Sequence, residues 1–370
     1  MRRQRGRTVE IDSLAELEAM LGRGATSMSG WHVQGLNLHH YTDRLRGLDA
    51  EGALFLGCRF GSDGDGRAVE EELRERGALI FPVVPDVPVD AYRTGLYSPA
   101  ELYDGLERSY EATADARIYA WSNGDGVDRS LAKALHDHAV DDALRDHVAG
   151  RRLVGVMGGH ALRRDTEEYA AAARLGHALA RGGLTVCTGG GPGAMEAANL
   201  GAYLSTHPLH VLDEALALLA AAPGFRPSVT AWARAASGVL QRWPDGADSV
   251  GIPTWHYGHE PPNLFATAIA KYFKNAIRED ILLHVCQAGI VFLPGAGGTV
   301  QEIFQDACEN YYADPARLAP MVLVGEQHWT VTLPAWPLLR ALAEDRPMQP
   351  VVHLVDDPRD VPALVLDRPC

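Results

Sequence analysis

From residue 151 onward, short apolar runs alternate with amphipathic segments, and glycine-rich turns separate the two. The first apolar run is Leu153–Met157, and further runs follow at 184–187, 249–252, 289–293, 321–324 and 351–355. Apolar runs of this length that alternate with helices are typical of a parallel sheet covered on both faces. We therefore predict that residues 149–370 form a doubly wound, Rossmann-like α/β domain.

The segments between these runs are predicted to be helices. Asp165 and Glu168 form a possible capping pair for a helix that ends near Arg181. Further helices are expected over 194–203, 263–286 and 298–312, and residues from about 205 to 247 are typical of an inserted pair of helices.

The first 148 residues are predicted to form a second α/β domain, since a chain of 370 residues suggests about two domains. Helix-like segments at 14–21, 68–76 and 132–147 occur together with apolar runs at 53–57 and 78–84. Pro82–Pro88 is rich in proline and is predicted to be a loop. This half contains no recognisable catalytic pattern, so the sequence assigns it no role.

Three glycine-rich loops follow predicted strands, at Gly158-Gly159, Gly189–Gly193 and Gly295–Gly298. In a doubly wound sheet, ligands bind at the carboxyl ends of the strands, where such loops lead into helices. Glycine allows backbone N–H groups to approach an anion closely, and the helix dipole adds a favourable potential. These loops predict a phosphorylated ligand, with tight turns that hold no ligand as the alternative.

The chain has 34 basic and 48 acidic residues, which gives a formal net charge of −14. A surface of this sign repels phosphate backbones and anionic lipids, so we expect neither polymeric nucleic acid nor a membrane as a partner. No apolar stretch approaches the roughly 20 residues of a membrane-spanning helix. The basic N-terminus is not followed by an apolar segment, so no signal peptide is predicted.

The cysteine and histidine patterns predict neither a disulfide framework nor a metal site. The five cysteines are widely spaced and contain no C-x-x-C pair, which fits a reducing cytoplasm. The pairs His39-His40 and His256/His259 have no third and fourth ligand at a usable spacing. We therefore expect a cytoplasmic protein that binds no metal.

The glycine loops differ from two common phosphate-binding patterns. Gly189-x-Gly191-x-x-Ala194 matches the dinucleotide-binding pattern, but the acidic pair about 20 residues later, Asp213-Glu214, falls in a predicted helix. Pro192 also removes one N–H donor from this loop. No Gly-Lys-Ser/Thr occurs, which excludes a Walker phosphate loop.

Two motifs resemble those of the Lonely Guy (LOG) family. Gly189–Met195, GGGPGAM, is similar to that family's G-G-G-x-x-G/A-x-M loop, and Pro294–Glu302, PGAGGTVQE, is similar to its P-G-G-x-G-T-x-x-E motif. Ala296 stands where the family usually has its second glycine. Glu260–Asn263, followed by a predicted long helix, resembles the larger bacterial members, and the resemblance extends over about residues 151–325.

The resemblance implies a phosphoribohydrolase that needs no cofactor. Such enzymes cleave the N-glycosidic bond of a nucleoside 5′-monophosphate to give the free base and ribose 5-phosphate. It also implies a homodimer or higher even oligomer, for which the expected helix 263–286 is the candidate interface element. Lysine decarboxylation, a label once given to such proteins, is not expected because neither Lys271 nor Lys274 lies at a predicted strand end.

The resemblance assigns candidate roles to particular residues. Glu302 would be the catalytic carboxylate, although Thr299-x-x-Glu302 is also a capping-box pattern. Arg278 would contact phosphate or substrate oxygens, or else be an ordinary exposed helix arginine. The remaining candidate substrate-binding residues are Gly158, Gly159, His160, Gly190, Gly191, Met195, Glu196, Pro294, Gly295, Gly297, Gly298 and Thr299.

Neighbouring residues are expected to complete this site. Glu196 would bind ribose hydroxyls, or else lie on a helix surface. Arg163 and Arg164 would supply local positive potential around a phosphate, which an acidic protein needs. The segment Trp255–Glu260 would form a wall of the base pocket.

Two other functions stay open at this level. A non-catalytic nucleotide-binding or sensing protein of the same fold would be stabilised by a nucleotide without consuming it. A dinucleotide-dependent oxidoreductase would have to bind NAD.

Overall fold

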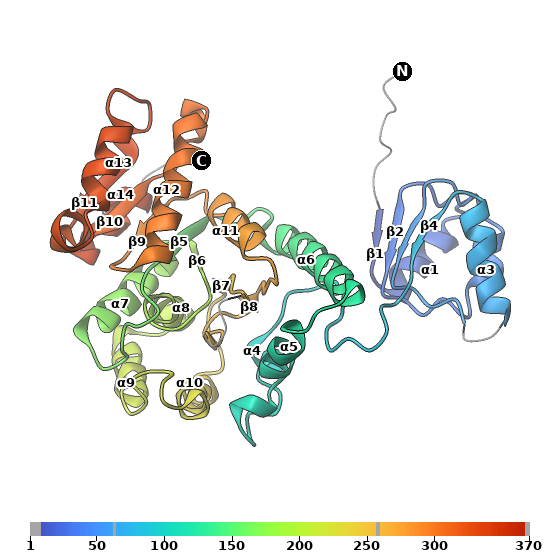
Figure 1. The fold of residues 1–370 in the computed structure, drawn as a ribbon, viewed down its shortest axis with the longest axis horizontal. Helices are drawn as coiled ribbons and strands as arrows, with labels where there is room; N and C mark the ends of the chain where they lie inside the picture. The colour runs from blue at the N-terminus through green and yellow to red at the C-terminus, as the bar shows by residue number, and fades with distance from the viewer. Residues whose placement is uncertain (1–8, 62–63, 257–259, 367–370) are drawn as a thin grey trace. The chain divides into compact units, whose positions relative to one another are not determined.

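The computed structural model describes residues 9–61, 64–256 and 260–366, and its internal contacts divide the chain into two units (Figure 1). Unit 1 comprises Met1–Gly95 and Gly124–Ala143, and unit 2 comprises Leu96–Asn123 and Leu144–Cys370. This division differs from a single boundary near residue 148, because Leu96–Asn123 packs with the second unit. The basic N-terminus, His259 and Cys370 lie outside the described residues.

Unit 1 contains a four-stranded parallel sheet whose spatial order follows the chain. Its elements are β1 (Val9–Ile11), α1 (Leu14–Gly22), β2 (Trp31–Gln34), α2 (Thr42–Arg46), β3 (Leu54–Leu56), α3 (Gly64–Glu75) and β4 (Leu79–Phe81). Right-handed crossovers that all run in one direction place their helices on one face of the sheet. Accordingly, Phe55 and Ile80 are buried in the core, whereas Leu79 and Phe81, which point the other way, are exposed.

Four helical elements lie between the two sheets in the sequence. They are α4 (Pro99–Leu102), η1 (Tyr110–Ala112), α5 (Ala114–Ser122) and α6 (Val127–Val148). The last of these helices begins in unit 1 and ends in unit 2.

Unit 2 contains a seven-stranded parallel sheet in the order β11-β10-β9-β5-β6-β7-β8. The strands are β5 (Leu153–Met157), β6 (Thr185–Thr188), β7 (Val250–Gly251), β8 (Ala268–Ile269), β9 (Ile290–Phe292), β10 (Met321–Val324) and β11 (Val352–Val355). The chain adds strands from β5 to β8 in one direction and then from β9 to β11 in the other. This reversal between β5 and β9 confirms the predicted doubly wound α/β fold.

Helices separate most of these strands. They are α7 (Glu167–Arg181), α8 (Ala194–Tyr203), α9 (Leu209–Leu219), α10 (Val229–Arg242), α11 (Asn275–His284), α12 (Gly297–Tyr312), α13 (Ala335–Ala343) and α14 (Val361–Leu366), with short helical turns η2 (Leu204–Thr206), η3 (Pro315–Arg317), η4 (His328–Thr332), η5 (Gln349–Val351) and η6 (Pro358–Asp360). The expected helical insert contains α9 and α10, on either side of Pro223-Gly224.

The predicted helix over 263–286 is wrong in its first half. Helix α11 begins only at Asn275, and the preceding residues contain strand β8, which pairs with β7. The side chain of Asn263 forms a turn at the start of this segment. Its Oδ1 accepts hydrogen bonds from the N–H groups of Phe265 and Ala266, at 3.1 and 3.0 Å. Pairing with the sheet therefore outweighs the amphipathic pattern in this segment. Of the candidate interface helix, only α11 is helical.

The predicted cap of α7 is also corrected. The capping residue is Thr166, whose hydroxyl accepts a hydrogen bond from the N–H of Tyr169 at 3.3 Å. Asp165 instead accepts hydrogen bonds from the guanidinium of Arg163, at 2.7 and 2.9 Å.

The segment Leu96–Asn123 is joined to unit 2 by main-chain and side-chain bonds. Tyr97 forms an antiparallel bridge with Ile269 of β8, with N–H to O distances of 3.0 and 2.8 Å. Asp115 is buried and accepts hydrogen bonds from Lys271 Nζ at 2.6 Å and from Trp255 Nε1 at 2.8 Å. Residues far apart in the sequence therefore form one core.

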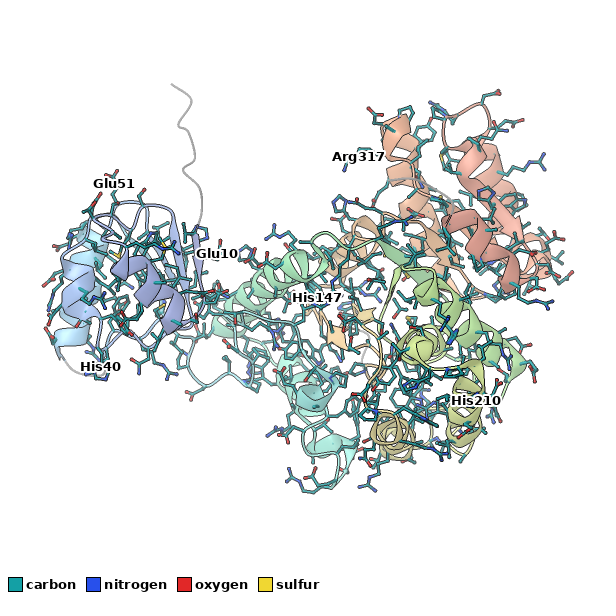
Figure 2. All side chains as sticks on the ribbon, turned by 180° about the vertical axis from the view of Figure 1, so that it is seen from behind. Glu10, His40, Glu51, His147, His210 and Arg317 are labelled. Atoms are coloured by element: carbon teal, nitrogen blue, oxygen red, sulfur yellow. The ribbon has the colours of Figure 1, made fainter. Side chains whose placement is uncertain are left out.

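Many charged side chains are exposed in both units, as Figure 2 shows for Glu51 in unit 1 and Arg317 in unit 2. Within the described ranges, none of the helices is long and apolar enough to span a bilayer. The same ranges contain no group of three His, Cys, Asp or Glu side chains arranged to hold a metal ion.

Candidate functional site

The loops after β5, β6 and β9 meet at the carboxyl edge of the unit 2 sheet. The N–H of Gly159 donates to the carbonyl of Pro294 at 3.1 Å, and the N–H of Ala194 donates to the carbonyl of Gly159 at 3.1 Å. The predicted loops at 158–159, 189–193 and 294–298 are therefore neighbours in the fold. They lie where doubly wound sheets bind their ligands.

Several of the glycines in these loops are required by packing. A Cβ added to Gly158 would lie 2.8 Å from the Cβ of Ala194, and one added to Gly190 would lie 2.6 Å from Pro253 Cδ. Gly193 has a φ of +74°, and a Cβ there would lie 2.4 Å from the carbonyl oxygen of Gly159. Close contact between loops is thus enough to explain these glycines.

The glycines at the start of α12 are different. Gly297 and Gly298 are exposed, and a Cβ on either would meet no atom within 4 Å. The residue that precedes the helix, Ala296, provides no side-chain cap for its N–H groups. The first turn of α12 therefore presents free N–H donors and the positive end of the helix dipole to open space.

The capping-box interpretation of Thr299 and Glu302 is wrong. Thr299 is the third residue of α12 rather than the residue before it. A Cβ on Gly295 would lie 2.1 Å from Thr299 Oγ1, so Thr299 packs directly on this loop. Glu302 lies a further turn along the helix and is buried.

Glu302 and Arg278 lie next to each other beneath the start of α12. Arg278 Nη1 is 3.7 Å from Glu302 Oε1 and 2.7 Å from Glu279 Oε1. Arg278 and Glu302 are 7% and 8% exposed. Burial raises the pKa of the Glu302 carboxyl to about 8; Arg278 opposes the rise, and the charges of Glu279 and Glu260 add to it.

Arg278 is held in place by carbonyl groups of two strand ends. Its Nε donates to the carbonyl of Ile252 at 2.7 Å, and its Nη2 donates to the carbonyl of Gly189 at 3.2 Å. A Cβ on Gly189 would lie 2.4 Å from Nη2 and 2.8 Å from Met195 Sδ. Arg278 is therefore buried in the site and is not an ordinary exposed arginine of a helix surface.

Glu260 belongs to the same cluster, although the sequence predicts it only as the end of the pocket wall Trp255–Glu260 and gives it no individual role. Its Oε1 lies 3.1 Å from His160 Nδ1, which connects it to the loop after β5. A Cβ on Gly191 would lie 3.7 Å from Glu260 Oε2. The Glu-Pro-Pro-Asn motif was the available sequence signal for this residue. Arg278 thus contacts the carboxylates of Glu279 and Glu302, and the charge of Glu260 also acts on Glu302.

Glu196 is fully buried and paired with Arg164. Both oxygens of Glu196 accept hydrogen bonds from Arg164, with Nε 3.1 Å from Oε2. Arg164 also donates to the carbonyls of Ala222 and Trp232 and lies 4.7 Å from the centre of the Trp232 ring. The pair thereby fastens the helical insert to α8, and its two charges neutralise each other.

Ion pairing and core packing also change the expected roles of Arg163, Arg164 and Trp255. Arg163 is paired with Asp165, so neither predicted source of local positive potential has a free charge. Trp255 is buried against Phe273, with ring centres 4.5 Å apart, and belongs to the core rather than to a pocket wall.

His160 also lines a cavity of about 250 Å³. The helical insert contributes Phe225, whose ring centre is 6.4 Å from that of His160, and Arg226, whose guanidinium lies 5.6 Å from the Phe225 ring. Its lining residues are His160–Arg163, Pro192, Gly193, Glu196, Pro223–Arg226 and Trp232. Glu302 and Arg278 do not line it, so the cavity adjoins the carboxylate cluster without containing it.

Comparison with known proteins matches part of this unit. Residues 151–207, from β5 through α8, match the model of the SLOG cluster4 family, LDcluster4. The SLOG superfamily includes the LOG family, whose motifs the two glycine loops resemble. A search among curated proteins finds no match.

Similar solved structures include a molybdenum cofactor binding protein and a molybdenum cofactor carrier protein. The molybdenum cofactor binding protein of Rippkaea orientalis is 17% identical, with a TM-score of 0.36 over 59% of this chain and 96% of that one. The molybdenum cofactor carrier protein of Chlamydomonas reinhardtii is 18% identical, with a TM-score of 0.35 over 58% of this chain and 96% of that one. Identity and TM-score this low carry no argument about the ligand.

Proposed function

We propose that the site in unit 2 hydrolyses the N-glycosidic bond of nucleoside 5′-monophosphates. The observation that carries this proposal is the buried Glu302, adjacent to Arg278 and one turn below an open helix N-terminus. The match to the SLOG cluster4 model supports nucleotide or cofactor binding over residues 151–207. The LOG-like motifs support the narrower substrate class.

The 5′-phosphate would bind at the first turn of α12. The N–H groups of Gly297 and Gly298 are open to an anion, and the helix dipole favours negative charge there. Because Glu302 follows within the next turn, the ribose of a bound nucleotide would extend toward its carboxyl group. A local site of this kind compensates for the net charge of −14.

In this mechanism Glu302 acts in its ionised form. Breaking the bond between C1′ and the base nitrogen develops positive charge on the ribose, which a nearby carboxylate stabilises. Water adds to C1′, the bonding pair leaves with the base, and the base nitrogen takes up a proton. Arg278 positions Glu302 and favours its ionised form. The departing base would lie toward His160 and the cavity lined by Phe225.

The test is base release by the purified full-length chain from purine, pyrimidine and cytokinin monophosphates, followed by chromatography. Turnover should increase as the pH rises toward about 8, because the carboxylate form of Glu302 becomes populated. Glu302→Gln should lower turnover by about a hundredfold or more. Glu309→Gln makes the same change two turns along α12, outside the site, and should retain activity. If none of the monophosphates releases its base at any pH up to about 8, the proposal fails.

One observation favours a second candidate, nucleotide binding without catalysis. The guanidinium of Arg278 is already engaged by two carbonyls and two carboxylates, which leaves it little capacity for a substrate. In that case, nucleotides would raise the melting temperature of the chain, and chromatography would recover them intact.

A further inference from the structure

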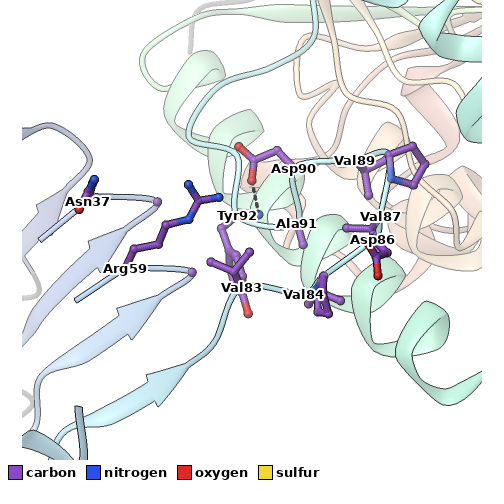
Figure 3. Close-up of a pocket in the computed structure, with 14 residues that line it drawn as sticks. Asn37, Arg59, Val83, Val84, Asp86, Val87, Val89, Asp90, Ala91 and Tyr92 are labelled. Carbon is purple, nitrogen blue, oxygen red and sulfur yellow. Dashed lines mark hydrogen bonds between the residues drawn. The ribbon is translucent and has the colours of Figure 1, made fainter. Parts of the chain in front are cut away.

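A cavity of about 610 Å³ lies in unit 1 (Figure 3). It opens at the carboxyl ends of β2, β3 and β4, the edge at which parallel α/β sheets bind ligands. Its lining residues are Gly35, Asn37, Gly57, Arg59 and Val83–Tyr92.

The loop that encloses this cavity is held closed at its base. Tyr92 Oη donates to the carbonyl of Pro82 at 2.9 Å, which joins the two ends of the loop. Gln34 Nε2 donates to the carbonyls of Tyr92 and Arg93, at 3.1 and 3.0 Å, and so attaches the loop to the end of β2. Gly57 has a φ of +62°, and a Cβ there would lie 2.2 Å from the Tyr92 ring, so the ring rests on the glycine.

Prolines at positions 82, 85 and 88 restrict the same loop further. A loop fixed at its base and stiffened by proline loses little conformational freedom when a ligand binds. The cavity is therefore largely formed before any ligand arrives.

One side of the cavity presents unused hydrogen-bond donors. Asn37 and Arg59 are direct neighbours, paired in a parallel bridge just beyond β2 and β3. Asn37 Oδ1 accepts a hydrogen bond from the N–H of His39, which leaves its amide N–H groups available. Figure 3 shows the Arg59 guanidinium directed toward the loop, with no hydrogen bond to any residue drawn. Adjacent guanidinium and amide donors suit a phosphate or carboxylate group.

The loop side of the cavity presents acceptors. Asp90 Oδ1 accepts a hydrogen bond from the N–H of Tyr92 at 3.0 Å, and its second oxygen is available to a ligand. Asp90 comes from the loop and Arg59 from the end of β3, and Figure 3 draws no interaction between the two side chains. Val83, Val84 and Val87 add apolar surface to the lining of the cavity.

We propose that this cavity binds a small metabolite that carries a phosphate or carboxylate group together with hydroxyl or ammonium donors. Arg59 and Asn37 hold the anionic group, and Asp90 accepts hydrogen bonds from the donors. A volume of about 610 Å³ accommodates a ligand up to the size of a nucleotide. This gives unit 1 a ligand-binding role that does not depend on the reaction proposed for unit 2.

The experiment is calorimetric titration of the full-length chain carrying Glu302→Gln, which removes the proposed turnover. The probes are ribose 5-phosphate, adenosine 5′-monophosphate and L-glutamate, which separate a phosphate from a carboxylate source. At least one should bind, and Arg59→Gln should weaken its affinity about tenfold or more. The matched control is Arg67→Gln, an exposed arginine of unit 1 outside the cavity, which should leave the affinity unchanged.

Asp90→Asn supplies the second arm of the test. Asparagine keeps an acceptor for the N–H of Tyr92 but loses the carboxylate charge, so affinity for the successful probe should fall while the fold is retained. The proposal is overturned if no probe binds, or if a probe binds equally well to the parent chain and to its Arg59→Gln variant.

Discussion

At the residue scale, the buried carboxyl group of Glu302 links the proposed chemistry to the stability of the fold. Removal from water favours its neutral form, and the carboxylates of Glu260 and Glu279 act in the same direction. Only Arg278 opposes them. The proposed reaction uses this group as a carboxylate, and its pKa of about 8 lies close to neutral pH.

The stability of the chain should therefore depend on pH through Glu302. Its pKa rises from 4.5 to about 8 on folding, so the folded state binds this proton more tightly than the unfolded state. The stability that this provides is complete below pH 4.5 and is lost as the pH rises through about 8. Melting temperatures measured across this range should fall, and Glu302→Gln should make the fall less steep. An unchanged slope would refute the assignment.

The sequence motifs identified Arg278 and Glu302, and the structure brings the two side chains together. The sequence offered no comparable signal for the partner of Glu196. Arg164 is 32 residues away, and only the folding of the insert brings the two together in a buried pair. Pairing of this kind is a tertiary property, which is why a charge next to a motif was interpreted as a ligand-binding group.

At the element scale, the first turn of α12 combines one crowded glycine with two open ones. Gly295 has Thr299 packed against it, whereas Gly297 and Gly298 face open space. The crowded position lets Thr299 pack against the loop, and the open positions leave the N–H groups of the helix accessible. These glycines therefore have different physical roles within one motif.

Alanine substitutions should separate these roles. Gly295→Ala forces its Cβ against Thr299 and should destabilise the fold by about 1–3 kcal/mol. Gly297→Ala meets no atom within 4 Å and should leave stability unchanged or slightly increased. Denaturant unfolding of the two variants measures the difference. Equal losses of stability would show that the motif requires glycine for another reason.

The elements that were predicted correctly are those whose pattern agrees with their surroundings. Strand β5 is buried along its whole length and was recognised as a continuous apolar run. The segment around β8 is wrongly predicted to be helical because its apolar residues also fit a helical period. Its actual conformation depends on pairing with β7 and Tyr97. No local pattern contains that information.

At the scale of the whole molecule, the segment Leu96–Asn123 determines where unit 2 begins. Asp115 supplies a buried carboxylate to Lys271, Trp255 and Tyr110, all within hydrogen-bond distance. Burial lowers the pKa of Lys271, and the Asp115 charge partly offsets this. The predicted boundary near residue 148 would place Asp115 in the first domain and Lys271 in the second, and would so separate the two members of this ion pair.

Removing this carboxylate should be costly for unit 2. Asp115→Ala leaves the Lys271 ammonium buried without its counter-ion, and we expect a loss of about 3–5 kcal/mol in unfolding free energy. The double variant Asp115→Leu/Lys271→Met should recover much of this loss, because it removes both charges. Asp104→Ala, an exposed aspartate of the same segment, is the control. If the double variant is no more stable than Asp115→Ala, the pair is not the source of the effect.

The path of the chain also limits how this protein can be divided. The chain passes from one unit to the other three times, after Gly95, after Asn123 and, within helix α6, after Ala143. A fragment that begins at residue 149 would lose both Tyr97 and Asp115, and would expose the edge of β8 and the charge of Lys271. Each unit is made of two separate segments, so no single cut in the chain yields either unit intact. A gene fusion or domain exchange with one junction therefore cannot transfer one unit without part of the other. The two units are therefore expected to be inherited together.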